Sequence, residues 1–324
     1  MLWLLSAIYG MVVCVRNFFH DHLLKAHRAN IKVIAVGNLS TGGTGKTPFC
    51  LWLFQNMLDA GWHPALALRG YAAKRGVSDE GLLYVQRLGH KPIFVGADRR
   101  RSLRDMGSQG FDLAILDDAF QHRRVARDLD IVLLDATHLP WEDALLPLGL
   151  FREPESSLSR AHVLVLTRTD LVAMEKIQHC ETHLRERHPH LLILRASAVV
   201  QGYFDGQGLP VDPAGGPYLL CSGIGRPGAF HALAEKSLLR IAGVLNYPDH
   251  HDYPQASLDA MISQARLLKA AAILTTEKDA VKLKDRLPYP VVVLKMAMEL
   301  EGDGRDKLHA LVRSRCGGPG VEHM

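Results

Sequence analysis

The chain has 324 residues, of which 48% are hydrophobic and 22% are charged, as in an ordinary globular protein. Because a common domain has ~100–150 residues, two domains are expected. The 38 Lys and Arg residues exceed the 34 Asp and Glu residues by only four, which gives no indication of a nucleic-acid partner. The five cysteines include no CxxC pair, so a disulfide framework and a structural zinc site are disfavoured and reduced thiols in a cytoplasmic compartment are expected.

The N-terminal segment is strongly apolar. Residues 1–15 carry no charged side chain, and Arg16 is the first charged residue. A membrane-spanning helix needs ~20 apolar residues, and neither the basic start nor the cleavage site of a secretory signal is present. Aromatic and leucine residues then alternate with basic ones up to Lys32, a pattern typical of a helix in the membrane interface. The alternative is a buried N-terminal helix, and the sequence does not decide whether a membrane helix spans or lies on the bilayer.

A glycine-rich loop follows the first predicted strand. Residues 31–36 are mostly apolar and predict a buried strand, and residues 48–60 have the spacing of a helix. Between them, GNLSTGGTGKT matches the end of a phosphate-binding P-loop, although Ser40 stands where the motif usually has its first glycine. Main-chain N–H groups of such a loop bind phosphate oxygens, Lys46 reaches the terminal phosphates and Thr47 offers its hydroxyl to Mg²⁺. The predicted ATP-binding residues are Ser40, Thr41, Gly42, Gly43, Thr44, Gly45, Lys46 and Thr47.

Further short apolar runs predict strands at residues 64–68, 92–95, 111–116, 129–134 and 163–166. Continuous apolar strands of this kind are typical of a parallel sheet covered on both faces. Asp117 and Asp118 follow the strand at 111–116, where a P-loop protein places its second magnesium anchor. The alternative is that one of them caps a helix and the other forms an ion pair with an arginine.

The second half of the chain also alternates strands and helices. Strands are predicted at residues 218–221, 241–245, 272–274 and 291–294, with helices at 229–237 and 258–270. A stretch rich in glycine and proline precedes them and predicts a hinge. The predicted organisation is an N-terminal helix at 1–30, a P-loop core at 31–198, a linker at 199–216 and a smaller α/β domain at 217–324.

The roles of several polar residues cannot be decided from their spacing alone. Arg152 and Glu153 could contact phosphate and metal or could pair with each other, and Asp79 and Glu80 have the spacing of a helix start. Residues 250–252, His-His-Asp, are a candidate proton-transfer site. Residues 275–282 follow a strand at the end where α/β proteins bind ligands, and helix capping is the competing interpretation. Residues 167–170, TRTD, weakly resemble a guanine-reading NKxD motif. The further candidate residues are Arg69, Gln121, His122, Glu277, Lys278 and Asp279.

The motifs taken in order resemble those of the tetraacyldisaccharide 4'-kinase family, the lipid A 4'-kinases of Gram-negative envelope biogenesis. The resemblance is carried by VGNLSTGGTGKTP, LRGY, SDE, LDDAFQHR, LPLGLFREP, SGIGRP, YPDHHDY and TEKDAVKL, which extend over nearly the whole chain. A P-loop alone occurs in many families, but this ordered set is specific. Ala119 stands where the family often has glycine, which leaves both preceding carboxylates in place.

The resemblance implies a P-loop kinase that transfers the γ-phosphate of ATP to the 4'-hydroxyl of a tetraacylated glucosamine disaccharide 1-phosphate. It implies Mg²⁺ bound by Thr47, Asp117, Asp118 and Glu153. It also implies that Asp79 and His250 act together as the base that accepts the hydroxyl proton, with Lys46 as a further catalytic residue. The enzyme is then expected as a peripheral protein at the cytoplasmic face of the inner membrane, with no nucleic acid and no obligate protein partner.

Two other functions are compatible with parts of the sequence. A P-loop GTPase or metallochaperone-like switch would explain the P-loop, the paired aspartates and TRTD, but not the apolar N-terminus or the second α/β half. An ATP-binding scaffold at the membrane surface, without transfer chemistry, would explain the N-terminus and the P-loop. A nucleotide panel distinguishes the first, since a switch hydrolyses GTP without a lipid acceptor.

Overall fold

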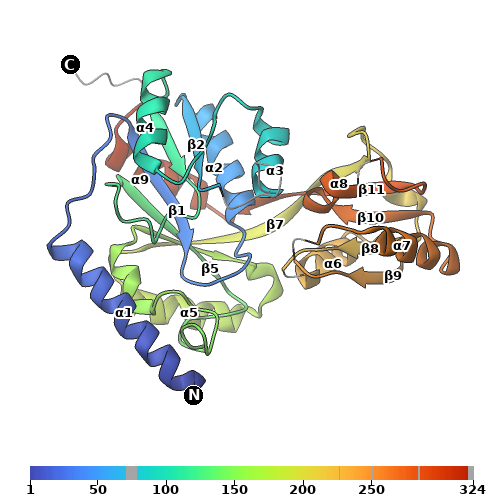
Figure 1. The fold of residues 1–324 in the computed structure, drawn as a ribbon, viewed down its shortest axis with the longest axis horizontal. Coiled ribbons are helices and arrows are strands. Elements are labelled where there is room, and N and C mark those ends of the chain that lie inside the picture. Colours follow the sequence, from blue (N-terminus) through green and yellow to red (C-terminus); the bar gives the residue numbers. More distant parts are fainter. Residues whose placement is uncertain (71–78, 226, 250, 284, 320–324) are drawn as a thin grey trace. The chain divides into compact units, whose positions relative to one another are not determined.

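The computed structural model describes the backbone of residues 1–70, 79–225, 227–249, 251–283 and 285–319, and side chains in these ranges except those of Asp79 and Glu80. The chain divides into two compact units (Figure 1). The first unit comprises residues 1–77, 87–197 and 298–324, and the second comprises residues 78–86 and 198–297. The five cysteines are free, in agreement with the expected reduced thiols.

The first unit contains the parallel sheet expected from the apolar runs. Its strands follow the order β3-β2-β4-β1-β5-β6-β7, and the pairs from β2–β3 through β6–β7 are parallel. The strands are β1 (Lys32–Asn38), β2 (Pro64–Leu68), β3 (Ile93–Val95), β4 (Leu113–Leu116), β5 (Leu129–Asp135), β6 (Val163–Thr167) and β7 (Leu192–Asp205), of which β7 belongs to this unit only up to residue 197. Strands β2, β4, β5 and β6 are buried throughout, because helices cover the sheet.

The helices of the first unit are α1 (Leu2–His22), α2 (Lys46–Asp59), α4 (Arg99–Ser108), α5 (Met174–Arg187) and α9 (Gly304–Cys316). Helix α2 packs on β1 and β2, α4 on β2 and β3, and α9 on β5. Val33 and Ala35 of β1 lie in one core cluster with Leu103 and Met106 of α4. Two short 3₁₀ turns, η1 (Glu155–Arg160) and η2 (Thr169–Leu171), flank β6. Helix α1 runs along the outside of the unit (Figure 1).

In the second unit the strands follow the order β11-β10-β8-β9, again with parallel pairs, as part of one 11-stranded sheet. Its elements are α3 (Asp79–Leu88), β8 (Tyr218–Ser222), α6 (Pro227–Lys236), β9 (Ile241–Asn246), α7 (Gln255–Leu267), β10 (Ala272–Thr276), α8 (Glu277–Leu283) and β11 (Val291–Leu300), with a 3₁₀ turn η3 (Pro213–Gly215). Alternate residues of β8 face opposite sides, since Tyr218 and Leu220 pack with α6 while Leu219 and Cys221 pack with α7. The α/β class with a mostly parallel sheet and an N-terminal apolar helix is therefore confirmed.

The compact units divide the chain differently from the predicted domain limits. The proposed linker at 199–216 begins inside β7, which continues to Asp205, and α9 belongs to the first unit. Residues 78–86 belong to the second unit. A composition rich in glycine and proline marks irregular backbone, but it does not show against which sheet a later segment packs.

Candidate phosphate-transfer site

The glycine-rich loop connects β1 to α2 in the first unit. The Asn38 side-chain amide contacts the loop: its Nδ2 lies 3.1 Å from Thr44 Oγ1 and 3.5 Å from the Gly42 carbonyl oxygen. Gly45 caps α2 with a φ of 91°, a conformation that glycine adopts without strain. A side chain at Gly45 would also approach Met298 Cε to 2.5 Å. The loop therefore opens a helix N-terminus, which is the local geometry that binds phosphate.

Lys46 and Asp118 face each other at this loop. Lys46 Nζ lies 3.4 Å from Asp118 Oδ1, and Arg152 Nη1 lies 3.3 Å from Asp118 Oδ2. Burial alone would raise the pKa of the Asp118 carboxyl, but the charges of Lys46 and Arg152 outweigh it and hold that pKa below its usual value. Asp118 also has a positive φ of 48°, which is strained for a residue other than glycine. The structure thus brings three of the predicted site residues together.

Asp117 lies beside Asp118 at the carboxyl end of β4, next to β1. Its side chain is buried, and Cys50 Sγ lies 3.8 Å from Asp117 Oδ1. Arg99, which the sequence did not indicate, is buried at the start of α4 and donates to the Asp117 carbonyl oxygen at 2.9 Å. The spacing of residues in RRRSLR does not show which of its arginines is buried, so Arg99 could not be distinguished from its exposed neighbours.

The segment from Leu145 to Glu153 lies against the phosphate loop. Thr41 N donates to the Leu150 carbonyl at 2.7 Å, and Arg152 N donates to the Leu39 carbonyl at 2.7 Å. Phe151 between them is buried. This pairing explains how Arg152, far from Asp118 in sequence, comes to lie beside it.

Glu153 points away from the Lys46–Asp118 pair and toward α1. Its Oε1 lies 3.0 Å from Arg16 Nη2, and its Oε2 accepts from Asn17 Nδ2 at 3.1 Å and from Arg160 Nη2 at 2.8 Å. Burial opposes ionisation, but the Arg160 charge and hydrogen bonds from Arg160, Ser157 and Asn17 hold the pKa of the Glu153 carboxyl below its usual value. Both carboxylate oxygens are therefore engaged by protein donors, and a metal role for Glu153 stays a prediction.

The other candidates of the first unit are Gln121, His122 and Arg69. Gln121 Nε2 donates to the Asn38 carbonyl at 2.8 Å and so supports the start of the loop. Burial, with the charges of Arg99 and neighbouring arginines, lowers the pKa of His122 to about 4. His122 Nε2 is buried and has no hydrogen-bond partner among the described residues. Arg69 is exposed at the end of β2.

The remaining candidates belong to the second unit. Asp279 is buried and accepts from Gly223 N at 3.1 Å and from Thr276 Oγ1 at 2.7 Å, and Lys278 Nζ lies 2.8 Å from Asp249. Glu277 begins α8 and is buried. The Asp79 side chain and His250 lie outside the described residues, so their predicted pairing stays a prediction. The backbone of Asp79 belongs to the second unit.

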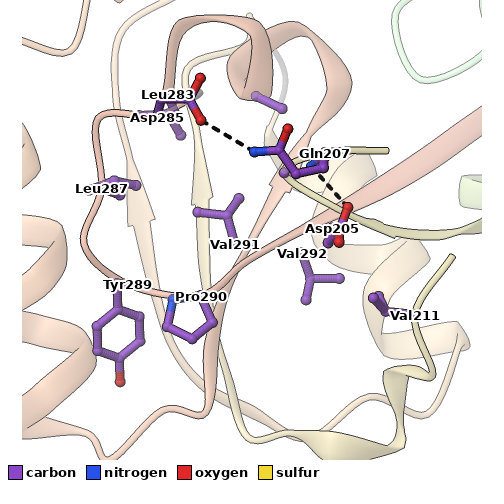
Figure 2. A pocket seen from close by; sticks show the side chains of 12 residues that line it. Asp205, Gln207, Val211, Leu283, Asp285, Leu287, Tyr289, Pro290, Val291 and Val292 are labelled. Atoms are coloured by element: carbon purple, nitrogen blue, oxygen red, sulfur yellow. Dashed lines mark hydrogen bonds between the residues drawn. The ribbon is translucent and has the colours of Figure 1, made fainter. Parts of the chain in front are cut away.

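A cavity of about 350 Å³ opens in the second unit (Figure 2). Aliphatic side chains of β11 and α8 line it, and the carboxylates of Asp205 and Asp285 lie at its edge. Gln207 contacts both carboxylates, because its main-chain N–H donates to Asp205 and its side-chain amide donates to Asp285. Carboxylates repel the phosphates of a nucleotide. This cavity is therefore unsuited to ATP, in contrast to the phosphate loop of the first unit.

Comparison with known proteins identifies the family. A family described as Tetraacyldisaccharide-1-P 4'-kinase matches residues 1–316. The chain belongs to this family. Two tetraacyldisaccharide 4'-kinases are similar over most of their length: that of Syntrophus aciditrophicus is 33% identical over 91% of this chain and 88% of the relative, and that of Bdellovibrio bacteriovorus is 31% identical over 95% and 96%.

A solved structure of the same family shares the fold. The crystal structure of LpxK from Aquifex aeolicus in complex with ATP superposes with a TM-score of 0.73 and 26% identity, and the match covers 96% of this chain and 97% of the other. The resemblance inferred from the ordered motifs is therefore confirmed, including both α/β halves. Membership of a tetraacyldisaccharide 4'-kinase family identifies an ATP-binding kinase and disfavours the GTPase-switch alternative.

Proposed function

We propose that this chain transfers the γ-phosphate of ATP to the 4'-hydroxyl of a tetraacylated glucosamine disaccharide 1-phosphate, a step of lipid A biosynthesis. Family membership supports the reaction. The observation that carries the proposal is the phosphate loop itself, whose Lys46 faces Asp118 at the end of the neighbouring strand. In a P-loop kinase the protein contributes mainly positioning and charge stabilisation, and these groups have the charge and placement for both.

We propose that Lys46 and Arg152 bind the terminal phosphates of ATP. In this structure both cations pair with the Asp118 carboxylate: Lys46 Nζ lies 3.4 Å from Oδ1, and Arg152 Nη1 lies 3.3 Å from Oδ2. When nucleotide arrives, its anionic oxygens can replace the Asp118 carboxylate as partners of these cations. Asp118 would then be available as an oxygen ligand for a divalent ion.

The oxygen donors at this site fit a magnesium ion that arrives with ATP. Mg²⁺ prefers oxygen ligands and is commonly held by one or two carboxylates together with substrate phosphates. Asp117 and Asp118 are adjacent at the end of β4, and Thr47 is the second residue of α2. The described residues include no group of three or more His, Cys, Asp or Glu side chains suited to a metal. Bound Mg²⁺ would offset the charge of the phosphates. We assign its protein ligands to Thr47, Asp117 and Asp118.

The acceptor hydroxyl requires a base, because a sugar hydroxyl is barely acidic. We propose Asp79 and His250 for this role from the family motifs SDE and YPDHHDY. Asp79 is the first residue of α3 in the second unit. Asp79 would hold the imidazole in the orientation that accepts the proton, which is the usual part of a carboxylate paired with histidine.

We propose that α1 lies on the membrane surface rather than crossing it. The helix is long and apolar enough to span a bilayer, and Trp3, Leu4 and Met11 are strongly exposed. Its inner side, however, is hydrogen-bonded to the first unit: Ser6 Oγ donates to the Leu145 carbonyl at 2.8 Å, and Tyr9 OH donates to the Arg152 carbonyl at 3.1 Å. A helix held in this way has one face for lipid and one for protein, as an interfacial helix does.

The decisive experiment is transfer of labelled γ-phosphate from ATP to a tetraacyl disaccharide 1-phosphate in detergent micelles, with Mg²⁺ or with a chelator. We expect labelled lipid only with Mg²⁺, and a loss of at least ~10²-fold in kcat/KM for Lys46→Ala, since a preorganised cation at the transferring phosphate is removed. Lys307→Ala is the matched control, because Lys307 pairs with Asp303 on the exposed side of α9. Hydrolysis of GTP without labelled lipid would instead identify a nucleotide switch.

A further inference from the structure

Strand β6 ends against the outer side of the phosphate loop. Thr167, its last residue, is fully buried, and its Oγ1 lies 3.0 Å from the Thr44 carbonyl oxygen. Arg168, the next residue, donates from Nη2 to the Gly43 carbonyl oxygen at 2.6 Å. Consecutive residues of TRTD therefore bind consecutive carbonyls of the loop. The proposed transfer mechanism does not use either residue.

The end of the neighbouring strand orients the arginine. Nη1 of Arg168 pairs with the carboxylate of Asp135, the last residue of β5, whose other oxygen accepts from Thr137. Arg168 itself has a φ of 58°, a left-handed conformation that is strained for a residue other than glycine. Such a conformation persists only where the surroundings determine it, and here contacts on two sides do so. The guanidinium is thus fixed between β5 and the loop.

Fixing these carbonyls determines where the loop's N–H groups point. In a trans peptide the C=O and the N–H of the next residue point in opposite directions. The Thr44 carbonyl shares its peptide plane with the N–H of Gly45, the residue that caps α2. When Thr167 holds that carbonyl outward, the Gly45 N–H is directed to the inner side of the loop, where phosphate oxygens bind.

We infer that Thr167 and Arg168 are positioning residues for ATP: they brace the phosphate loop from outside, and Asp135 orients the arginine. This inference rests on the proposed kinase function. It also gives TRTD a role different from guanine reading, since the donors of its first two residues are directed at loop carbonyls. A brace of this kind lowers the cost of ordering the loop around nucleotide, so its removal weakens ATP binding and leaves acceptor binding unchanged.

The test compares Thr167→Val, Arg168→Gln and Arg168→Lys, with Thr169→Val as the matched control. Thr169 is also buried, but its hydroxyl donates to the Ala196 carbonyl and to Glu301 rather than to the loop. For each variant the KM for ATP, the KM for the lipid acceptor, kcat and the affinity for a fluorescent ATP analogue are measured.

Loss of one buried hydrogen bond predicts a KM for ATP about five- to tenfold higher in Thr167→Val. Arg168→Gln removes a charged donor from both of its partners and is expected to raise the KM for ATP about ten- to hundredfold. Arg168→Lys should recover part of the loss, because an ammonium keeps the charge but cannot serve carbonyl and carboxylate in the planar arrangement of a guanidinium. The acceptor KM should stay within about twofold in every variant.

The inference is overturned if Arg168→Gln and Thr167→Val both bind the ATP analogue as the unaltered protein does. It is equally overturned if Thr169→Val weakens nucleotide binding as much as Thr167→Val, since the effect would then be a general loss of packing. Nucleotide binding separates this inference from the proposed reaction. A protein that binds the analogue with the expected order of affinities, but never labels lipid, would retain the brace and refute the kinase assignment.

Discussion

Replacing Glu153 by Gln tests whether this residue anchors α1 or binds metal. The carboxylate is fully buried and is engaged by Arg16, Asn17 and Arg160. The Arg160 contact is also buried, and a hydrogen bond between charged groups there contributes about 1.5–3 kcal/mol. The Arg16 side chain is 41% exposed, so its contact is discounted for solvent screening to about 1 kcal/mol or less. Glutamine keeps the shape but loses the charge, so a destabilisation on the order of 3 kcal/mol is expected.

The assay is thermal unfolding together with Mg²⁺ titration of kinase activity. A loss on the order of 3 kcal/mol predicts a fall in Tm of about 6 °C or more for a unit of this size. Glu142→Gln is the control, because Glu142 and Lys176 form an equally close pair with both side chains 40% exposed. A loss of about 1 kcal/mol or less there predicts a change in Tm of at most about 4 °C. The Mg²⁺ concentration for half-maximal activity should be unchanged. An unchanged Tm combined with a raised Mg²⁺ requirement would refute the anchoring role and establish Glu153 as a metal ligand.

Three further outcomes are expected. Asp79→Ala should lower kcat by ~10²–10⁴-fold and leave the KM for ATP unchanged, and equal turnover would remove Asp79 from the mechanism. Trp3→Glu with Leu4→Glu should reduce binding to anionic vesicles at least ~10-fold in a flotation assay, since two exposed apolar side chains no longer enter the lipid. The folded-state pKa of His122 is lowered to about 4, so the unfolded state binds a proton first and the protein loses stability as pH falls from ~6.5 toward 4. In His122→Gln the free energy of unfolding should fall by ~1–2 kcal/mol less over this pH range. An unchanged pH profile of the free energy of unfolding would contradict the lowered pKa.

Much of the first unit could be predicted from the sequence because its strands are short, continuous apolar runs. The runs at 64–68 and 129–134 correspond to β2 and β5 within one residue. Strand β7 was missed although it begins with the apolar run at residues 192–194, because it continues into RASAVVQGY and its burial is partial along Leu192–Asp205. Periodicity detects elements buried on a whole face, and it fails for a strand whose side chains are half exposed.

The candidate site was predictable only where motif and topology coincide. Lys46 and Asp118 follow neighbouring parallel strands, so the meeting of their side chains follows from β1 pairing with β4. Arg99 could not be found in this way, because it donates to the main-chain carbonyl of Asp117. Arg168 pairs with Asp135, but its contact with the loop is also to a main-chain carbonyl, that of Gly43. Every residue has a main-chain carbonyl, so the residue type at a position does not indicate whether its carbonyl accepts from a distant arginine.

The position of α1 changes how membrane and nucleotide binding are related. The inner side of the helix bonds to the segment from Leu145 to Glu153, and that same segment bonds to the phosphate loop through Leu150 and Arg152. One short segment therefore contacts both α1 and the glycine-rich loop. Because hydrogen bonds on its two sides share one backbone, loosening α1 removes support from Arg152, the partner of Asp118. On this geometry α1 is part of the first unit's packing rather than an appended anchor, and loss of the helix should weaken ATP binding even in detergent, where no membrane is present.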